Sequence, residues 1–132
     1  MIIGIGHDLS DITRMAKIID GRTGSRFMER VLSAGERELA AQYQGERLYQ
    51  FTAGRFAAKE AVVKAFGCGI GQVIGFTDIE ILRGDCGKPV CRLSEAAWSR
   101  LGLNPEAVSI HVTITHERTL ASAFAVAERI MQ

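Results

Sequence analysis

The segment from Leu48 to Phe66 constrains the fold most, because it predicts one long and mostly apolar helix. A helix that is apolar on most of its surface has to be covered by other elements, so it belongs in the core of the domain. Three glycines predict that it ends in a flexible loop: Gly67, Gly69 and Gly71. In its second part, from Phe56 to Gly67, three charged residues interrupt the apolar sequence and need an explanation: Lys59, Glu60 and Lys64.

Alternation in the second half of the chain predicts strands. Apolar and polar residues alternate over 108–115, which is typical of a half-buried strand, and His116 falls in phase with the apolar side. The segment Leu120 to Glu128 is rich in alanine and could form a helix, but the short connection after His116 favours an antiparallel partner strand. Residues 77–82 and 90–93 flank a set of turn residues and predict a hairpin.

The remaining elements are a strand and shorter helices. Residues Met1 to Gly6 form an apolar run broken by glycine, which is typical of a buried strand. A helix follows from Asp11, with Ser10 or Asp11 as its cap, and a capping box at 33–36 starts another. A further capped helix covers Ser94 to Leu101. We therefore expect an α+β fold in which a mainly antiparallel sheet packs against the long helix.

Composition indicates one globular domain over residues 1–132, with 47% hydrophobic and 23% charged residues. No apolar run approaches the roughly 20 residues that a membrane-spanning helix needs. The amino terminus shows neither a basic leader nor a cleavage site, so we expect a cytoplasmic protein. The cysteines are odd in number and lack Cys-x-x-Cys spacing, which predicts three free thiols: Cys68, Cys86 and Cys91.

Basic residues gather in one segment although the net charge is only +1, a balance that argues against a general nucleic-acid binder. Between Arg14 and Arg30 there are five basic residues and two acidic ones. Arg22, Arg26 and Arg30 are four apart, so on a helix they would line one face. Spacing alone is compatible with a solvated face and with a docking surface for an acidic partner.

Glu60 projects from an apolar face of the long helix, beside Phe56 and Val63, at about 100° per residue. A buried lone carboxylate is costly unless a cation meets it. One explanation is an i,i+4 ion pair with Lys64. The other is a metal ion shared with Asp8, which we expect at the end of the first strand. Magnesium commonly binds one or two carboxylates and completes its shell with water and substrate phosphates.

Two long motifs carry a family resemblance: GIGHDLSDITRM at residues 4–15 and GRFAAKEAVVKAFG at residues 54–67. Shorter matches are DIE at 78–80, GKP at 87–89 and the strand end at 113–116. Together they resemble the phosphopantetheinyl transferases, specifically the bacterial holo-acyl-carrier-protein synthases, over nearly the whole chain. The fold expected is therefore the 4'-phosphopantetheinyl transferase fold.

The resemblance implies that the 4'-phosphopantetheine group of coenzyme A is transferred to a serine of apo-acyl carrier protein, releasing adenosine 3',5'-bisphosphate. It implies that Asp8 and Glu60 hold magnesium against the diphosphate and that Lys64 supplies a positive charge to phosphate. Lys88 and His116 would also contact coenzyme A. Four arginines would meet the acidic helix of the carrier protein: Arg14, Arg22, Arg26 and Arg30. The resemblance further implies a homotrimer with active sites between subunits.

Two positions depart from the family pattern. His7 stands where a small hydroxyl residue is commoner, and Glu117, after His116, stands where threonine or aspartate is commoner. The acceptor of the serine proton therefore stays open among a metal-bound water, Glu60, His7 and His116. The preferred carrier protein, acceptance of acyl-coenzyme A, and manganese in place of magnesium also stay open. A non-enzymatic binding module would explain the arginines alone, and a metal-dependent hydrolase the carboxylates alone.

Overall fold

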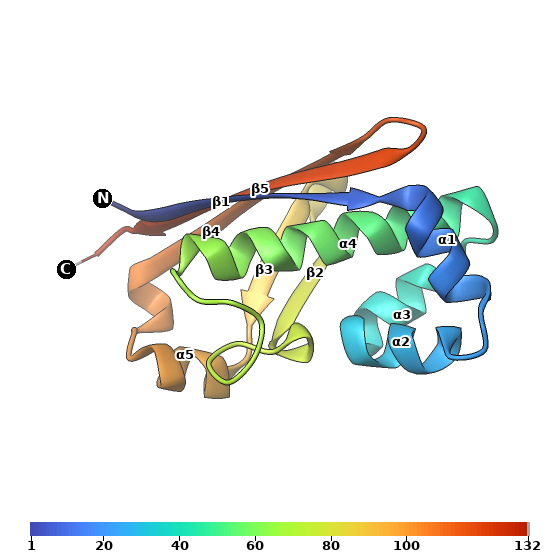
Figure 1. The fold of residues 1–132 in the computed structure, drawn as a ribbon. Helices are drawn as coiled ribbons and strands as arrows, with labels where there is room; N and C mark the ends of the chain where they lie inside the picture. The colour runs from blue at the N-terminus through green and yellow to red at the C-terminus, as the bar shows by residue number, and fades with distance from the viewer. Residues whose placement is uncertain (132) are drawn as a thin grey trace.

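A three-stranded antiparallel sheet lies along the long helix α4, in the computed structural model that describes residues 1–131 (Figure 1). The strand order in this sheet is β1-β5-β4, and a separate hairpin pairs β2 with β3. The strands are β1 (Ile2–Asp11), β2 (Ile79–Arg83), β3 (Pro89–Leu93), β4 (Val108–His116) and β5 (Leu120–Arg129). The predicted α+β fold with a mainly antiparallel sheet is confirmed.

The helices form two groups around α4. Figure 1 shows α1, α2 and α3 gathered at the amino-terminal end of α4, and α5 near its other end, beside the hairpin. The helices are α1 (Ile12–Asp20), α2 (Gly24–Val31), α3 (Ala34–Ala40), α4 (Glu46–Ala65) and α5 (Glu95–Leu101). Three 3-10 turns complete the fold: η1 (Phe76–Asp78), η2 (Asp85–Gly87) and η3 (Pro105–Ala107).

Most helix ends occur where capping residues predicted them. Asp11 caps α1 by accepting a hydrogen bond from the Arg14 amide at 3.0 Å, and Ser33 with Glu36 forms the capping box of α3. Gly102 ends α5 in the left-handed conformation, and Gly67 follows α4 with a φ of 76°. Helix α3 ends at Ala40, before the turn that leads into α4.

Two predictions about the first thirty residues were wrong. Strand β1 continues to Asp11 because its polar second half still pairs with β5, so Asp8 lies inside the strand and not at its end. Helix α1 ends at Asp20 and α2 begins at Gly24, which leaves Arg22 in the intervening turn. Only Arg26 and Arg30 therefore share a helix face, one turn apart.

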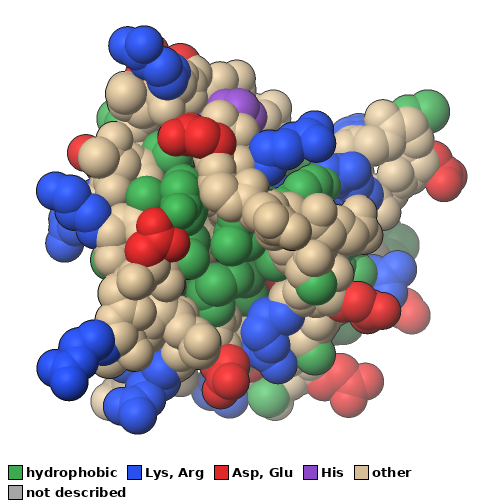
Figure 2. Space-filling model, turned by 90° about the vertical axis from the view of Figure 1, so that its right-hand side faces the viewer, with side chains coloured by type: hydrophobic (Ala, Val, Ile, Leu, Met, Phe, Trp, Pro, Cys, Tyr) green, Lys and Arg blue, Asp and Glu red, His purple; other side chains and the backbone are tan. Residues whose placement is uncertain are grey.

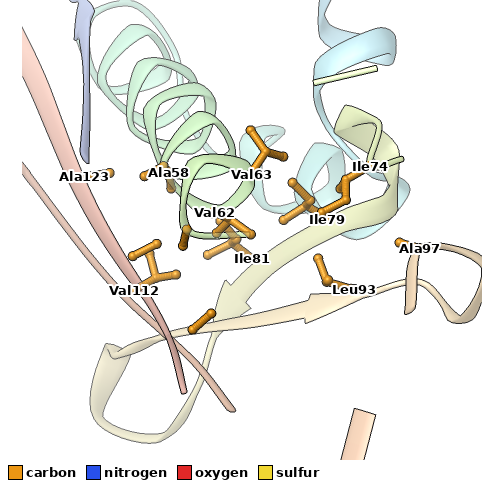
Figure 3. Packing of buried hydrophobic residues seen from close by; sticks show 14 of the residues in the cluster. Ala58, Val62, Val63, Ile74, Ile79, Ile81, Leu93, Ala97, Val112 and Ala123 are labelled. Carbon is orange, nitrogen blue, oxygen red and sulfur yellow. The ribbon is translucent and has the colours of Figure 1, made fainter. Parts of the chain in front are cut away.

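Small side chains let α4 lie close against the sheet. Alternate residues of β5 face the helix and are fully or almost fully buried: Ala121, Ala123, Ala125 and Ala127. This burial explains why an alanine-rich segment forms a strand here, since tertiary packing outweighs the helix propensity of alanine. Figure 3 shows the same core continuing from α4 through Val62 and Val63 to the hairpin residues Ile79 and Ile81.

The opposite face of the sheet is open and carries exposed apolar side chains. On this outer face β1 presents Ile5 and Leu9, which are 60% and 51% exposed, and β5 presents Phe124, which is 47% exposed. The three cysteines are free thiols, as predicted. No helix within residues 1–131 combines the length and the apolar character needed to cross a membrane.

Candidate active site

Two glycines bring β1 into direct contact with α4. A Cβ atom on Gly6 would lie 1.8 Å from the Ala61 carbonyl oxygen, and one on Gly4 would lie 2.0 Å from that of Ala65. Only glycine permits such an approach of strand to helix backbone. Side chains of a strand alternate between its faces, so Asp8 has the same inward orientation as Gly4 and Gly6. The glycines of the first motif thus set the distance between Asp8 and the helix.

Asp8 meets Lys64 at this contact. The Lys64 ammonium donates hydrogen bonds to Asp8 Oδ1 at 2.9 Å and to the His7 carbonyl oxygen at 3.1 Å. The Lys64 side chain is half exposed and that of Asp8 is mostly covered. The i,i+4 ion pair between Glu60 and Lys64, one of the two explanations for Glu60, does not form among residues 1–131. Lys64 instead joins the helix to the strand.

Glu60 lies near enough to Asp8 for the two carboxylates to repel each other. Burial, and then the negative charge of Asp8, raise the pKa of Glu60, while Lys64 opposes the rise. In the described part of the chain the Glu60 carboxylate has neither a hydrogen bond nor an ion pair. Two carboxylates and one lysine leave one negative charge unbalanced, so Asp8 and Glu60 together fit a divalent ion with oxygen ligands.

A second metal is not supported by the side chains present. Within residues 1–131 no group of three or more histidine, cysteine or acidic residues could surround an ion. Hydrolases that use two metals gather more ligands than this. Asp8 and Glu60 fit a single ion of the kind that completes its shell with water and substrate phosphates.

A basic pocket of about 310 Å³ lies on another side of α4. His116 lines it together with Gly87 and Pro89 of the GKP motif. Lys88 lies between these two residues in the chain but is not itself part of the lining. Sequence reasoning missed three arginines in the wall: Arg47, Arg55 and Arg83. Burial lowers the pKa of Arg55, whose Nε donates to the Ile81 carbonyl oxygen at 3.0 Å.

The pocket and the carboxylates face different directions in one chain. Arg55 and Phe51 line the pocket, and Glu60 is five and nine residues further along α4. At roughly 100° per residue, Glu60 projects about 140° to 180° away from these two side chains. One ligand that touches both the basic pocket and the carboxylates would therefore have to pass around the helix or bridge two copies of the chain.

The basic patch, defined as Arg14, Arg22, Arg26 and Arg30, is exposed on α1, on α2 and in the turn between them. None of the four forms an ion pair within residues 1–131. Figure 2 views this end of the molecule and shows charged side chains around a hydrophobic hollow. Half-buried aromatic residues were not predicted here: the Phe27 and Phe56 rings lie 6.3 Å apart, and those of Phe56 and Phe76 lie 5.3 Å apart.

Two histidines lie on the outer face of the sheet. His7 alternates with Asp8 and points away from α4, where its ring stacks on Phe124 at 4.1 Å and its Nε2 lies 3.0 Å from the Ser122 hydroxyl. The Nε2 of His111 lies 2.9 Å from Glu128 Oε1. Neither imidazole shares the face of the two carboxylates.

Comparisons with known proteins agree with the motifs. A family model described as ACPS, the 4'-phosphopantetheinyl transferase superfamily, matches residues 4–127. A holo-[acyl-carrier-protein] synthase of Bacillus cytotoxicus is 44% identical over 128 residues, which cover 97% of each chain. The match to the family model spans both the first and the second motif.

Solved structures extend the similarity to the fold. A Bacillus anthracis holo-(acyl-carrier-protein) synthase, solved in complex with CoA (3',5'-ADP), has a TM-score of 0.83 at 40% identity and covers 98% of both chains. A Helicobacter pylori holo-[acyl-carrier-protein] synthase in complex with coenzyme A has a TM-score of 0.80 at 31% identity, over 94% of this chain and 99% of that one. The chain belongs to the 4'-phosphopantetheinyl transferase superfamily and has its fold.

Proposed function

We propose that this chain transfers the 4'-phosphopantetheine group of coenzyme A to a serine of apo-acyl carrier protein and releases adenosine 3',5'-bisphosphate. The observation that carries the proposal is the meeting of Asp8 and Lys64 at the contact of the two motifs, with Glu60 beside them. The relatives from Bacillus cytotoxicus and Bacillus anthracis are named for this reaction and support it. The reaction takes place in the cytoplasm, where thiols stay reduced.

Asp8 and Glu60 hold a magnesium ion in this proposal. The fit rests on the uncompensated Glu60 carboxylate and on the small number of ligands, both typical of a magnesium site completed by phosphates. When bound, the ion supplies neutralisation of the negative charge on the diphosphate during phosphoryl transfer. Manganese satisfies the same oxygen ligands, so metal titration decides between them.

Lys64 orients Asp8 and balances part of the negative charge of the two carboxylates. Its ammonium holds Asp8 and the backbone of β1 in place, and as a point charge it serves the phosphate once substrate is bound. The serine proton passes to water or to Glu60 when the acceptor belongs to the same chain, because His7 faces away from the carboxylates. His116 contacts coenzyme A from the wall of the basic pocket.

The basic pocket binds the nucleotide half of coenzyme A, and Lys88 extends the turn that borders it. Three arginines supply positive charge for phosphate, His116 supplies a ring nitrogen for hydrogen bonding, and Pro89 and Phe51 supply apolar surface. Glu60 points away from this pocket within one chain. One coenzyme A can therefore contact the basic pocket of one subunit and the carboxylates of a neighbouring subunit. The open outer face with Ile5, Leu9 and Phe124 offers an apolar surface for such an assembly, which we propose is a homotrimer.

The basic patch docks the acidic carrier protein. Arg14, Arg22, Arg26 and Arg30 are exposed and have no acidic partner within residues 1–131, and the neighbouring Phe27 and Phe56 rings add apolar contact. Such charge complementarity guides association and sets orientation more than it adds raw affinity.

Mass spectrometry tests the reaction directly. Incubated with coenzyme A, magnesium and an apo-carrier protein, the chain should add one phosphopantetheine group to the carrier. Removal of divalent ions with a chelator should abolish the mass shift, and titration with magnesium should restore it. Asp8→Asn and Glu60→Gln keep the size of each side chain and should raise the magnesium concentration needed for half-maximal rate. Consumption of coenzyme A without modification of the carrier would refute the proposal.

A further inference from the structure

Lys59 stands directly before Glu60 in the second motif, but it points into the protein. Its side chain is completely buried in α4. The ammonium has three hydrogens to donate, and each finds an oxygen: the Val31 carbonyl at 2.7 Å, Glu36 Oε1 at 2.6 Å and the Phe76 carbonyl at 2.9 Å. These oxygens belong to α2, α3 and η1, so the Lys59 side chain joins three segments to α4.

Glu36 is the counter-charge and is equally buried. Besides Lys59, its Oε1 accepts a hydrogen bond from the Ser33 amide at 2.8 Å, and its Oε2 accepts one from the Ile81 amide at 2.7 Å. The Ser33 hydroxyl in turn donates to Glu80 of the DIE motif at 2.6 Å. The capping box of α3 and part of the DIE motif thus belong to the same network as Lys59.

A buried ion pair is a poor way to gain stability, because the cost of removing two charges from water offsets most of their attraction. Its main effect is on geometry. Every buried polar group must keep its hydrogen-bond partners, so the segments that supply these partners are held in one arrangement. Val31 is the last residue of α2, the helix that carries Arg26 and Arg30. Lys59 therefore holds the end of α2 against the turn of α4 that carries Glu60.

We propose that Lys59 is a positioning residue that holds the carrier-docking helix α2 in register with the metal-binding carboxylate Glu60. Through its bonds to the Val31 carbonyl and to Glu36, the ammonium fixes where Arg26 and Arg30 lie relative to the reacting centre. A carrier protein docked on these arginines then presents its serine at the phosphate. Without the ammonium, the docking surface and the reacting centre each persist, but their relative placement is lost.

The test compares the two substrates in one assay and rests on the proposed transfer reaction. Lys59→Met removes the ammonium and keeps a long unbranched side chain, and the double variant Lys59→Met/Glu36→Gln also removes the unpaired carboxylate charge. Leu93→Ala is the matched control for lost stability, because Leu93 belongs to the hydrophobic core but lies on β3. Melting temperature and both KM values are measured for each variant.

We expect the double variant to regain most of the melting temperature that Lys59→Met loses, because no uncompensated charge stays buried. Its KM for carrier protein should nevertheless remain roughly tenfold above that of the wild type, while its KM for coenzyme A changes less than about twofold. Leu93→Ala should lower the melting temperature and leave both KM values unchanged. An equal rise of both KM values in the double variant, or their full recovery, would overturn the proposal.

Amide hydrogen exchange, measured on the wild-type protein, gives a second test of the proposal that does not depend on the folding of any variant. A carrier protein whose acceptor serine is replaced by alanine should bind the basic patch and slow exchange of the Ser33 and Ile81 amides, which both donate to Glu36. Unchanged exchange at both amides would overturn the coupling. A wild type that leaves the unsubstituted carrier unmodified would instead refute the proposed function itself.

Discussion

Gly6→Ala is the most direct test of how the two motifs form one site. The new Cβ would lie 1.8 Å from the Ala61 carbonyl oxygen, whereas ordinary van der Waals contacts begin at 3.4 Å. Strand β1 must therefore move away from α4 by about 1.6 Å, the difference between these distances. Both atoms belong to rigid elements, so no side-chain rotation can absorb the clash. Asp8, two residues along the strand, moves away from Lys64 and Glu60.

The expected effects differ in size. Overpacking of this kind costs about 1 to 3 kcal/mol of stability, so the variant should still fold. A displacement of about 1 Å in a catalytic constellation can cost roughly 100-fold in rate, so kcat/KM for the carrier protein should fall by about that factor. The magnesium concentration for half-maximal rate should rise as well, because Asp8 leaves its partner carboxylate.

Gly69→Ala is the matched control. A Cβ on Gly69 would meet nothing within 4 Å, so this variant adds the same methyl group in open space. Initial rates of carrier modification are measured at 25 °C across a magnesium titration, with circular dichroism to establish that each variant is folded. A Gly6→Ala enzyme with the rate and magnesium dependence of Gly69→Ala would show that the strand-to-helix distance does not control the site.

Three further measurements address separate parts of the protein. Arg14→Glu should raise the KM for carrier protein far more than that for coenzyme A, with a difference that shrinks as salt rises; equal effects would remove Arg14 from the docking surface. His7→Ala should leave both limbs of the rate-versus-pH profile in place, because its ring stacks on Phe124; a lost limb would assign it proton transfer. Although burial alone would raise the pKa of Asp78, hydrogen bonds from Ser94 and the Gly75 amide and the charge of Arg100 hold it below its ordinary value. That stabilisation is complete above the unfolded pKa of about 3.9 and disappears as pH falls through the folded value, so the melting-temperature loss of Asp78→Asn should be large near pH 7 and shrink below about pH 4. A loss that is constant with pH would contradict this.

Local patterns were sufficient for most of the secondary structure. The alternation of β4 and the caps at Asp11, Ser33 and Ser94 depend on neighbouring residues, and each predicted element appears near its expected place. The alanine-rich strand β5 was predicted because a short connection leaves no room for another geometry. These features need no knowledge of distant parts of the chain.

Features that depend on remote partners were predicted less well. The polar half of β1 becomes strand because β5 supplies its hydrogen bonds, and sequence periodicity contains no sign of that pairing. The basic pocket draws Arg47 and Arg55 from α4 and Arg83 from β2, so no single motif contains it. Arg22 was expected to share a helix with Arg26 and Arg30 because the three are four apart, but α2 begins only at Gly24.

Three of the charged residues on α4, Lys59, Glu60 and Lys64, lie close together in the sequence but have different surroundings in the fold. Lys59 is paired with Glu36, 23 residues away, and Lys64 is paired with Asp8, 56 residues away. Each lysine is thus matched by a carboxylate from another segment, which makes both compatible with a helix in the core. Glu60 alone is left with a raised pKa and no cation of its own within residues 1–131. The fold pairs both lysines with carboxylates and leaves unpaired the one carboxylate that a bound metal would satisfy.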